Sequence, residues 1–369
     1  MSFRIKRAHV RHVETPIAKP VVTAFGTMTS RHAVFLVVED DAGNTGVGES
    51  WVNFPHWAAW ERVATFEHAF IPYLAGKEVD DVAAFCRTMY AAFRGPAVQS
   101  GTVGTLLAAV CAVELALWDL AARREGLPLN RLLFDDPADR VRVYASGINA
   151  PVPFDLVDAH LDRGVTLFKL KLGFGDDADR ANLDALAKHL DGRAQIAVDV
   201  NRGWTLDEAQ RWLDVLADRD VQWLEEPLRA EEETSLATLY ETGKVPIAMG
   251  ENTVLEPTSE ATTLADLLAH VVQPDLTKYA PLHVTLRSLA EVARVGKRLV
   301  PHFLGSAPGQ AVSLHFASGC PDALVELDIN PNPLRTDLMT EPFTIEDGRI
   351  RIPDAPGLGW TLHGDGHAK

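Results

Sequence analysis

The feature that most constrains the fold is a regular alternation of short apolar runs and longer amphipathic stretches, which begins at residue 141. Eight apolar runs follow one another about every 24 residues, which is the length of one strand–helix unit. The runs are VRVYAS (141–146), TLFKLK (166–171), QIAVDV (195–200), VQWLEE (221–226), VPIAMG (245–250), HVVQPD (270–275), RLVPHF (298–303) and ALVELD (323–328). Seven helices are expected between them. The alternation predicts a parallel sheet, and eight such strands close most naturally into a (β/α)7β barrel, a modified TIM barrel.

An open doubly wound α/β sheet is the alternative, but no G-x-G-x-x-G turn follows the first run to support it. The chain before residue 141 has a different pattern. Residues 1–60 predict strands and turns, and residues 58–94 and 101–125 predict helices. The chain therefore begins with an α+β region that precedes the barrel.

Composition excludes several classes of protein. Hydrophobic residues make up 47% of the chain and charged residues 23%, which is typical of a folded protein. The formal net charge of −16 argues against binding to nucleic acid or to anionic membranes, because both require a basic surface. Cys86, Cys111 and Cys320 match no metal-ligand spacing and predict buried, reduced thiols. The N-terminus has no signal peptide pattern, and Glu114 and Asp119 interrupt the longest apolar stretch, so a cytoplasmic location is expected.

Polar side chains stand at the carboxyl ends of the apolar runs, where a barrel of this kind carries its chemistry. Asp199, Glu225 and Glu251 end three consecutive strands and are spaced 26 residues apart. Any one of them alone is better explained as a helix cap or a surface ion-pair partner. Three carboxylates that converge on one small volume repel one another unless a cation lies between them. Because Asp199, Glu225 and Glu251 stand at matching positions on consecutive strands, they predict a site for a hard divalent cation with oxygen ligands, preferably Mg²⁺.

Lys169 and Lys171 interrupt the otherwise apolar second run in the sequence FKLKLG. Because they are two residues apart, both side chains lie on the same face of the strand. A salt-bridged pair on an exposed edge strand is the usual explanation, but a barrel strand has no edge. We expect each ammonium group, together with the metal, to lower the pKa of the other, so that a lysine can act as a base near neutral pH.

Asp275 ends the sixth run and His302 lies in the seventh. A carboxylate bonded to one ring nitrogen would orient the imidazole and leave the other nitrogen free to transfer a proton. A single histidine at a strand end is more often structural, whereas this pairing predicts a second acid or base. Lys171 and His302 would then face opposite sides of whatever the metal holds. That layout suits removal of a proton next to a carboxylate, followed by proton donation from the opposite group.

These motifs together resemble those of the enolase superfamily, in its mandelate racemase branch, over nearly the whole chain. AAVCAVELALWDLAARREGLPLNRLLF (108–134) is similar to the segment that ends the family's N-terminal capping domain, and FKLKLG, VDVNRGW, WLEEP, MGENT, QPDLTK and VPHF then follow in the family's order. Each motif is weak alone, but six in order at barrel spacing are specific. The resemblance implies an α+β capping domain over residues 1–135, completed by 335–369, and a catalytic barrel domain over residues 136–334.

Carried over residue by residue, the resemblance implies that Asp199, Glu225 and Glu251 bind Mg²⁺. It makes Lys171 one base, and Lys169 the neighbour that tunes its pKa and touches the substrate carboxylate.

The same resemblance makes His302 with Asp275 the second acid or base, and it implies that Asn201 and Glu326 contact the carboxylate end of the substrate. Asp275 also separates the branches, because muconate-lactonizing relatives carry a catalytic lysine at that position. Specificity is expected to come from the capping domain, around residues 25–29 and 51–57.

The activity implied first is a Mg²⁺-dependent carbon–oxygen lyase, a dehydratase that removes the α-proton of an acid sugar and expels the β-hydroxyl to give a 2-keto-3-deoxy acid. A racemase or epimerase of a 2-substituted carboxylate and a cycloisomerase of a sugar-acid lactone share the same enolate intermediate, so an isomerase is the runner-up. A non-catalytic sugar-acid-binding protein is the alternative of another class, although binding alone needs no proton acceptors. The expected partners are a small-molecule carboxylate and further copies of the chain, in a dimer or an octamer.

Overall fold

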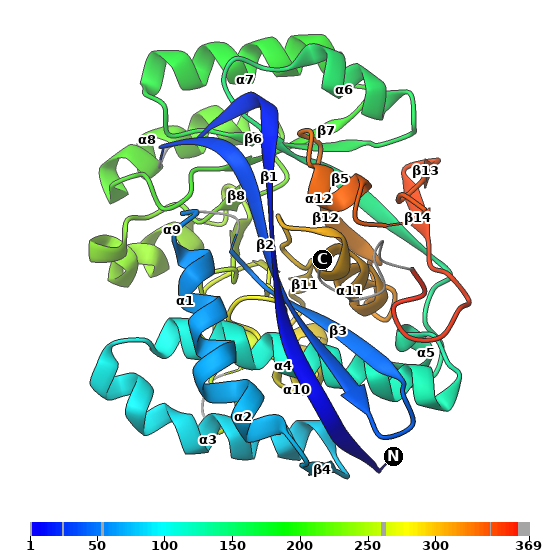
Figure 1. Cartoon of the computed structure of the whole chain (residues 1–369). Coiled ribbons are helices and arrows are strands. Elements are labelled where there is room, and N and C mark those ends of the chain that lie inside the picture. The colour runs from blue at the N-terminus through cyan, green and yellow to red at the C-terminus, as the bar shows by residue number, and fades with distance from the viewer. Residues whose placement is uncertain (1, 24–25, 53–54, 260–262, 340, 361–369) are drawn as a thin grey trace.

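The computed structural model describes residues 2–23, 26–52, 55–259, 263–339 and 341–360. Figure 1 shows an antiparallel sheet and a group of helices from the first third of the chain, packed against a ring of strands and helices from the remainder. The (β/α)7β barrel with an N-terminal α+β cap that the sequence predicts is therefore confirmed.

The N-terminal sheet contains four strands in the order β3-β2-β1-β4, and the paired strands are antiparallel. They are β1 (Phe3–Thr23), β2 (Gly26–Asp40), β3 (Thr45–Ser50) and β4 (Glu78–Val79). The tight turn between β2 and β3 is fixed by Asp40, whose Oδ1 accepts hydrogen bonds from the backbone N–H of Ala42 at 3.0 Å and of Asn44 at 2.8 Å. Gly43 has a φ of +87°, which glycine adopts without strain.

The helices of this region are α1 (Ala58–Thr65), the π-helix η1 (Phe66–Phe70), α2 (Ile71–Leu74), α3 (Val82–Ser100), α4 (Val103–Glu125) and α5 (Leu129–Leu133). The predicted helix over 58–94 is interrupted at residues 75–81, where Gly76 has a φ of +74° and β4 joins the sheet. Asp81 then caps α3 by accepting a hydrogen bond from the N–H of Ala84 at 2.6 Å.

Helix α4 is the central element of the N-terminal region. By length and composition it could cross a membrane, but 83% of its apolar window is buried inside the fold, so it is a core helix. The predicted apolar stripe at three- and four-residue steps is buried along its whole length: Leu106, Val110, Val113, Leu117 and Leu120. The three cysteines are also buried and free, as expected.

The barrel contains eight parallel strands, each close to a predicted run: β5 (Arg140–Ile148), β6 (Leu167–Lys171), β7 (Gln195–Asp199), β8 (Leu224–Glu225), β9 (Ile247–Met249), β10 (Val271–Val272), β11 (Arg298–Leu299) and β12 (Leu324–Asp328). Neighbours in sequence are paired from β5 to β11, and β12 pairs with β5. Between β12 and β11, the N–H of Glu326 donates to the carbonyl of Pro301 at 3.5 Å, which closes the ring.

Six α-helices connect these strands: α6 (Phe154–Leu161), α7 (Asp176–Leu190), α8 (Leu206–Ala217), α9 (Leu236–Thr242), α10 (Leu282–Arg294) and α11 (Ala307–Ala317). The 3₁₀ helix η2 (Ala230–Ser235) precedes α9. Between β9 and β10, the described residues contain only the 3₁₀ helix η3 (Leu264–Asp266), where a seventh helix was expected. Pro257 disfavours a helix through this connection, because it lacks a backbone donor.

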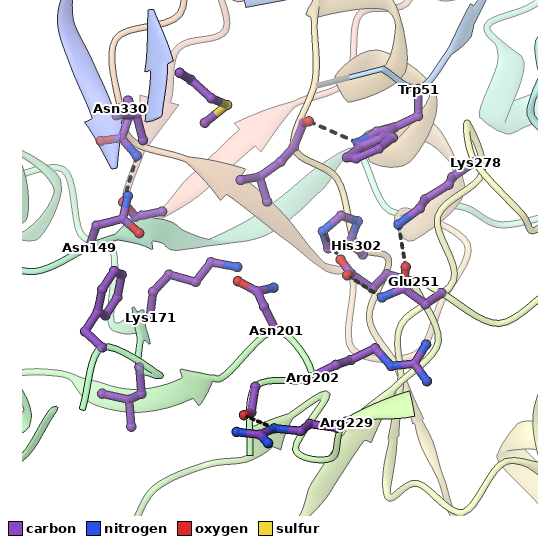
Figure 2. Close-up of a pocket in the computed structure, with 18 of the residues that line it drawn as sticks. Trp51, Asn149, Lys171, Asn201, Arg202, Arg229, Glu251, Lys278, His302 and Asn330 are labelled. Atoms are coloured by element: carbon purple, nitrogen blue, oxygen red, sulfur yellow. Dashed lines mark hydrogen bonds and ion pairs between the residues drawn. The ribbon is translucent and has the colours of Figure 1, made fainter. Parts of the chain in front are cut away.

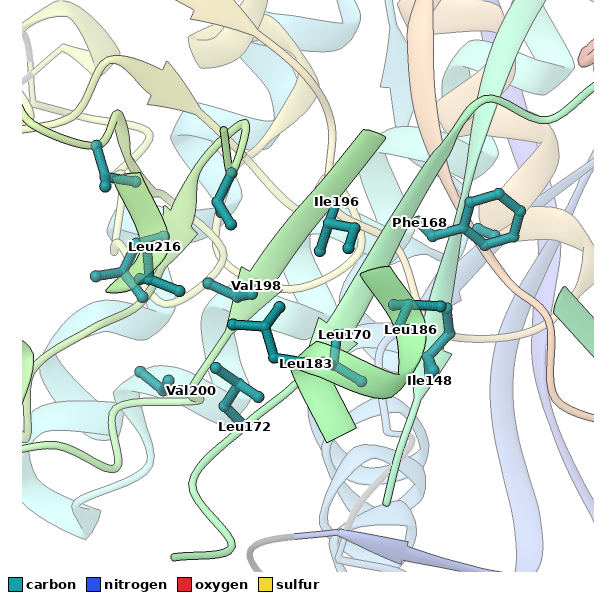
Figure 3. Close-up of a cluster of buried hydrophobic side chains, with 14 of the residues drawn as sticks. Ile148, Phe168, Leu170, Leu172, Leu183, Leu186, Ile196, Val198, Val200 and Leu216 are labelled. Carbon is teal, nitrogen blue, oxygen red and sulfur yellow. The ribbon is translucent and has the colours of Figure 1, made fainter. Parts of the chain in front are cut away.

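The main core lies between the strands and the surrounding helices (Figure 3). Phe168 and Leu170 of β6 and Val198 of β7 point outward and pack against helix residues such as Leu183 and Leu186 of α7. Because side chains alternate along a strand, the residues between them point into the barrel. This alternation directs Lys169 to the interior.

The chain ends with α12 (Pro333–Thr336) and the hairpin of β13 (Ile345–Glu346) and β14 (Arg349–Arg351), which pairs with β5 of the barrel. Residues 357 and 358 then contact the N-terminal region: Leu358 N–H donates to Asp119 Oδ1 at 2.8 Å, and Leu129 N–H donates to Gly357 O at 2.8 Å. The closing segment thus contacts both parts of the fold. Its residues 361–369 lie outside the described residues, and the domain boundary near 135 stays a prediction.

Candidate active site

A cavity of about 590 Å³ lies at the carboxyl ends of the barrel strands, beneath the N-terminal sheet (Figure 2). Four of the side chains predicted for the site line this cavity: Lys171, Asn201, Glu251 and His302. The other five are fully buried behind them at the same end of the barrel: Lys169, Asp199, Glu225, Asp275 and Glu326. The structure therefore brings all nine predicted residues together.

Lys169 is surrounded by carboxylates in the barrel interior. It contacts Glu225, and its Nζ lies 2.7 Å from Glu326 Oε1 and 3.8 Å from Asp199 Oδ2. Burial lowers the pKa of Lys169, but the charges of Glu225 and Glu326 outweigh it and hold the pKa well above its ordinary value.

Lys171 lies two residues after Lys169, at the end of β6, and lines the cavity. Its Nζ contacts Asp199, which lies beside it in the parallel ladder. Burial lowers the pKa of Lys171 and Asp199 raises it, with a net increase. As expected, the charge of Lys169 lowers the pKa of Lys171, but Asp199 raises it by more, so the net pKa lies above its ordinary value.

His302 and Asp275 form the predicted pair. His302 Nδ1 lies 2.9 Å from Asp275 Oδ2, while Asp275 Oδ1 accepts hydrogen bonds from Thr277 N–H at 2.8 Å and from its hydroxyl at 2.6 Å. The carboxylate is therefore held on both sides and orients the ring. Nε2 of His302 points to the cavity side, 2.5 Å from Glu251 Oε2. Burial lowers the pKa of His302, but Glu251 and Glu326 raise it well above its ordinary value.

The predicted metal ligands end three adjacent elements of the barrel, with Lys171, Asp199 and Glu225 side by side in the ladder. Among the described residues, however, no three acidic, histidine or cysteine side chains converge as a metal-binding group. Asp199 contacts Lys171 and Glu225 contacts Lys169, so the carboxylates are turned toward the nearest cations.

The charge and chemistry of this site nevertheless fit Mg²⁺. Six buried carboxylates lie at this end of the barrel, Asp199, Glu225, Glu226, Glu251, Asp275 and Glu326, and among the described residues they outnumber the cationic groups beside them, which are Lys169, Lys171, Arg202, Lys278 and His302. Burial, reinforced by Asp199, raises the pKa of Glu225 to about 8. A divalent cation with oxygen ligands is the species that such an excess of buried carboxylate accommodates.

The N-terminal region contributes the roof of the cavity through Met28 and Arg31 of β2 and through Trp51, which follows β3. Nη2 of Arg31 donates to Asp328 Oδ2 at 3.1 Å, and Nε1 of Trp51 donates to the carbonyl of Leu304 at 3.2 Å. The predicted specificity segments 25–29 and 51–57 thus lie partly on the cavity. Phe25, Asn53 and Phe54 lie outside the described residues.

Several residues that line the cavity were not predicted from the sequence as site residues. Lys278 donates from Nζ to Asn252 Oδ1 at 2.7 Å and lies 4.6 Å from the centre of the Trp51 ring. Asn252 in turn donates to Glu251 Oε1 at 2.8 Å, which links the roof to a predicted metal ligand. Lys278 could have been found from its place in QPDLTK. Arg31 could not, because it reaches the cavity only through packing of the sheet on the barrel.

Beyond β8, Glu226 is buried next to Glu225 with a φ of +43°, a conformation that residues other than glycine seldom adopt. Burial raises its pKa to about 7, and its Oε2 has no hydrogen-bond partner among the described residues. Asn201 and Arg202 after β7 also have positive φ angles, of 47° and 58°. Three such residues cluster at the carboxyl ends of two neighbouring strands, which is typical of functional sites.

Comparison with known proteins assigns the chain to a family. Residues 5–133 match the mandelate racemase / muconate lactonizing enzyme N-terminal domain, and residues 155–366 match the enolase C-terminal domain-like family. A crystal structure of a mandelate racemase/muconate lactonizing enzyme from Bordetella bronchiseptica RB50 is 35% identical, covers 98% of this chain and 97% of its own, and has a TM-score of 0.88.

Two further relatives differ in the reaction that their names give. L-talarate dehydratase from Polaromonas sp. JS666, whose structure contains Mg and L-glucarate, is 29% identical over 99% of this chain and 96% of its own, with a TM-score of 0.83. D-galactarolactone cycloisomerase from Agrobacterium fabrum (strain C58) is 26% identical over 99% of this chain and 97% of its own. Matches over both domains, and over almost the full length of all three relatives, show that this chain belongs to the mandelate racemase branch of the enolase superfamily.

Proposed function

We propose that the protein is a Mg²⁺-dependent dehydratase of an acid sugar, which removes the proton α to the carboxylate and expels the β-hydroxyl to form a 2-keto-3-deoxy acid. The observation that carries this proposal is that two proton-transfer groups, Lys171 and the His302–Asp275 pair, line one cavity. Elimination of water needs one group to accept a proton and one to donate a proton to the departing hydroxyl.

The lining of the cavity supports a polyhydroxylated substrate. Four asparagines line it (Asn149, Asn201, Asn252 and Asn330), together with Arg31, Arg202 and Arg229. An amide group can both donate to and accept from a hydroxyl group, so these side chains suit a chain of hydroxyls better than a flat aromatic acid. The relative that binds L-glucarate is consistent with such a substrate.

Asp199, Glu225 and Glu251 would hold the Mg²⁺, and the bound ion supplies positive charge to the substrate carboxylate, which favours loss of the α-proton. Side chains of the protein carry out the proton transfers and orient the reacting groups. Lys171 and His302 exchange protons with the substrate from opposite sides, and Asp275 holds the imidazole ring so that Nε2 faces the reacting carbons. Lys169 and Glu326 are buried, and we assign to them the positioning of Lys171 and His302.

A second candidate is a sugar-acid lactone cycloisomerase, which is favoured by the 26% identical relative of that name. It would use the same two proton-transfer groups but would produce an isomer of the substrate, with no loss of water. Product mass therefore distinguishes the two reactions.

The test is a panel of aldonic, aldaric and uronic acids and their lactones, incubated with Mg²⁺ and assayed for 2-keto acid and for change of mass. Lys171→Ala and His302→Asn should abolish the product, while Lys244→Ala, an exposed lysine paired with Asp214, should not. If no acid that demonstrably binds reacts or exchanges its α-proton in D₂O, the protein is a binding protein and the proposal is wrong.

A further inference from the structure

A second cavity lies at the opposite end of the barrel from the candidate active site. It has a volume of about 240 Å³ and is lined by the first residues of several strands and by β14. Three arginines and one carboxylate line it: Arg142 of β5, Arg298 of β11, Arg349 of β14 and Asp347 in the turn before β14. In Figure 1, β14 lies beside β5 at the edge of the barrel.

Arg142 and Arg349 are exposed and Arg298 is half-buried, so the three arginines stand at the open mouth of the barrel. Arg142 and Arg298 each lie two residues before an interior residue, Tyr144 and Val300 respectively. Because strand side chains alternate, both arginines occupy inward positions at the mouth. Tyr144 belongs to an apolar layer that separates this mouth from the candidate active site, and Lys169 Nζ lies 5.6 Å from the centre of its ring.

Arg349 is directly opposite Arg142 in the antiparallel ladder. The turn that places it there is fixed, because Val143 N–H donates to Gly348 O at 2.9 Å and Gly348 N–H donates to Arg163 O at 2.7 Å. A Cβ on Gly348 would lie 2.3 Å from the carbonyl oxygen of Gly164, so only glycine allows this approach.

The positive charges of Arg142 and Arg349 differ from those of the neighbouring arginines in their ion-pair partners. Arg140 and Arg351 also face each other in the same ladder, but each has an acidic partner, Glu346 at 3.5 Å and Asp354 at 3.3 Å. Arg298 likewise pairs with Asp322 at 2.8 Å.

Among the described residues, neither Arg142 nor Arg349 forms an ion pair with a carboxylate, although Arg142 Nη2 donates to the carbonyl of Asp322 at 3.4 Å. Like charges directly opposite one another destabilise a sheet.

We propose that this mouth of the barrel is a binding site for a compact oxyanion with two or more negative charges, such as phosphate or a small dicarboxylate. The planar guanidinium groups of Arg142 and Arg349 would clamp the anion by paired hydrogen bonds. Thr166, Gln195 and Gln222, which also line the cavity, supply uncharged polar groups around it. The site is independent of the reaction proposed above.

Titration calorimetry at low ionic strength, with inorganic phosphate in one arm and succinate in the other, tests this site. Arg142→Gln and Arg349→Gln should each weaken binding at least about tenfold, because each removes a charge-assisted pair of hydrogen bonds. Arg351→Gln is the matched control, since this arginine lies on the same strand with its own acidic partner, and it should bind as the wild type does.

Thermal unfolding provides a second readout that separates binding from misfolding. Without added anion, Arg349→Gln should melt at a higher temperature than the wild type, because it removes the like-charge pair. With phosphate, only the wild type and Arg351→Gln should shift upward. Binding of succinate alone would support the site and assign a dicarboxylate as its ligand.

Equal affinity in the wild type and Arg349→Gln would overturn the proposal, as would the absence of binding by both anions. A loss of phosphate binding in Lys171→Met but not in Arg349→Gln would also overturn it, because the anion would then occupy the candidate active site.

Discussion

The two lysines of β6 show how a single residue's position decides its chemistry. Lys169 and Lys171 point to the same side of the strand, but the side chain of Lys169 is fully buried, whereas that of Lys171 is 11% exposed and lines the cavity. Lys171 therefore stands where a substrate would enter, and contact of Lys169 with the substrate carboxylate stays a prediction. Lys169 is instead enclosed by Glu225 and Glu326, which hold its charge inside the barrel.

Lys171→Ala and His302→Asn should each lower kcat by about 10²–10⁴-fold, which is the usual contribution of a general acid or base. Steady-state kinetics on the acid sugar found by the panel would measure this effect. Unchanged melting temperatures in both variants would show that the fold is intact. Turnover within a few-fold of the wild type in either variant would remove that residue from the proton-transfer pair.

Glu225→Gln should weaken Mg²⁺ binding by at least about tenfold, since even residues that only support a metal ligand contribute that much. Calorimetric titration of Mg²⁺ in the absence of substrate measures the affinity directly. Glu233→Gln, an exposed glutamate paired with Arg202 at 3.0 Å, serves as the control. An unchanged Mg²⁺ affinity in Glu225→Gln would exclude Glu225 from the ligand set.

At the scale of elements, the close packing of β3 against α4 determines how the N-terminal region is built. Gly46 and Gly48 face the helix, and a Cβ on them would lie 2.1 Å from Ala116 O and 1.9 Å from Ala112 O. The backbone of the strand therefore touches the backbone of the helix. This contact holds Glu49, the next residue of β3, at a fixed depth in the interface with the barrel.

Gly48→Ala should destabilise the protein by about 1–3 kcal/mol or more, because backbone atoms cannot move aside as a flexible side chain can. Gly95→Ala is the control: this glycine lies in α3, a Cβ there meets nothing within 4 Å, and we expect no loss of stability, because alanine is favoured over glycine inside a helix. Urea unfolding of both variants gives the free energies. Equal stabilities would contradict the close approach of β3 to α4.

At the scale of the whole molecule, buried polar contacts join the N-terminal region to the barrel. Glu49 of β3 accepts hydrogen bonds from Ser306 N–H at 3.0 Å, from the Ser306 hydroxyl at 2.6 Å and from Gly309 N–H at 2.9 Å, at the start of α11. The N-terminus of a helix favours an anion, although burial raises the pKa of Glu49 to about 7. Arg31 and Asp328 form a second such contact beside the cavity.

His315 of α11 forms a third junction and predicts a dependence of stability on pH. Its Nδ1 accepts from Asn130 N–H at 3.1 Å and its Nε2 donates to Leu358 O at 3.0 Å, so the ring is held neutral. Burial lowers its pKa from 6.5 to about 4. Below pH 6.5 the unfolded chain therefore binds a proton that the folded chain does not, and stability is lost as the pH falls through this range.

The free energy of unfolding should fall by about 2 kcal/mol through His315 alone between pH of about 7.5 and about 5. Urea unfolding at both pH values, in the wild type and in His315→Gln, isolates this contribution. The variant should be less stable at the higher pH, because it loses buried hydrogen bonds, but should lose less stability on acidification. Identical losses in both proteins would contradict a buried neutral His315.

The sequence by itself determined the barrel, its eight strand positions and the nine residues of the candidate site. It could do so because these features are local: apolar runs locate strands, alternation sets which side chains face inward, and the ends of parallel strands meet at one edge. Lys171, Asp199 and Glu225 are therefore neighbours in the ladder as the spacing required.

The tertiary structure alone decided which groups meet across the fold. The pairing of Glu49 with α11, of Arg31 with Asp328, and of Arg142 with Arg349 joins residues far apart in the chain, and no local pattern encodes it. The raised pKa of Lys171 also depends on contacts that only the tertiary structure makes. An ionisation equilibrium depends on distances to all neighbouring charges and on burial, and only packing sets these quantities.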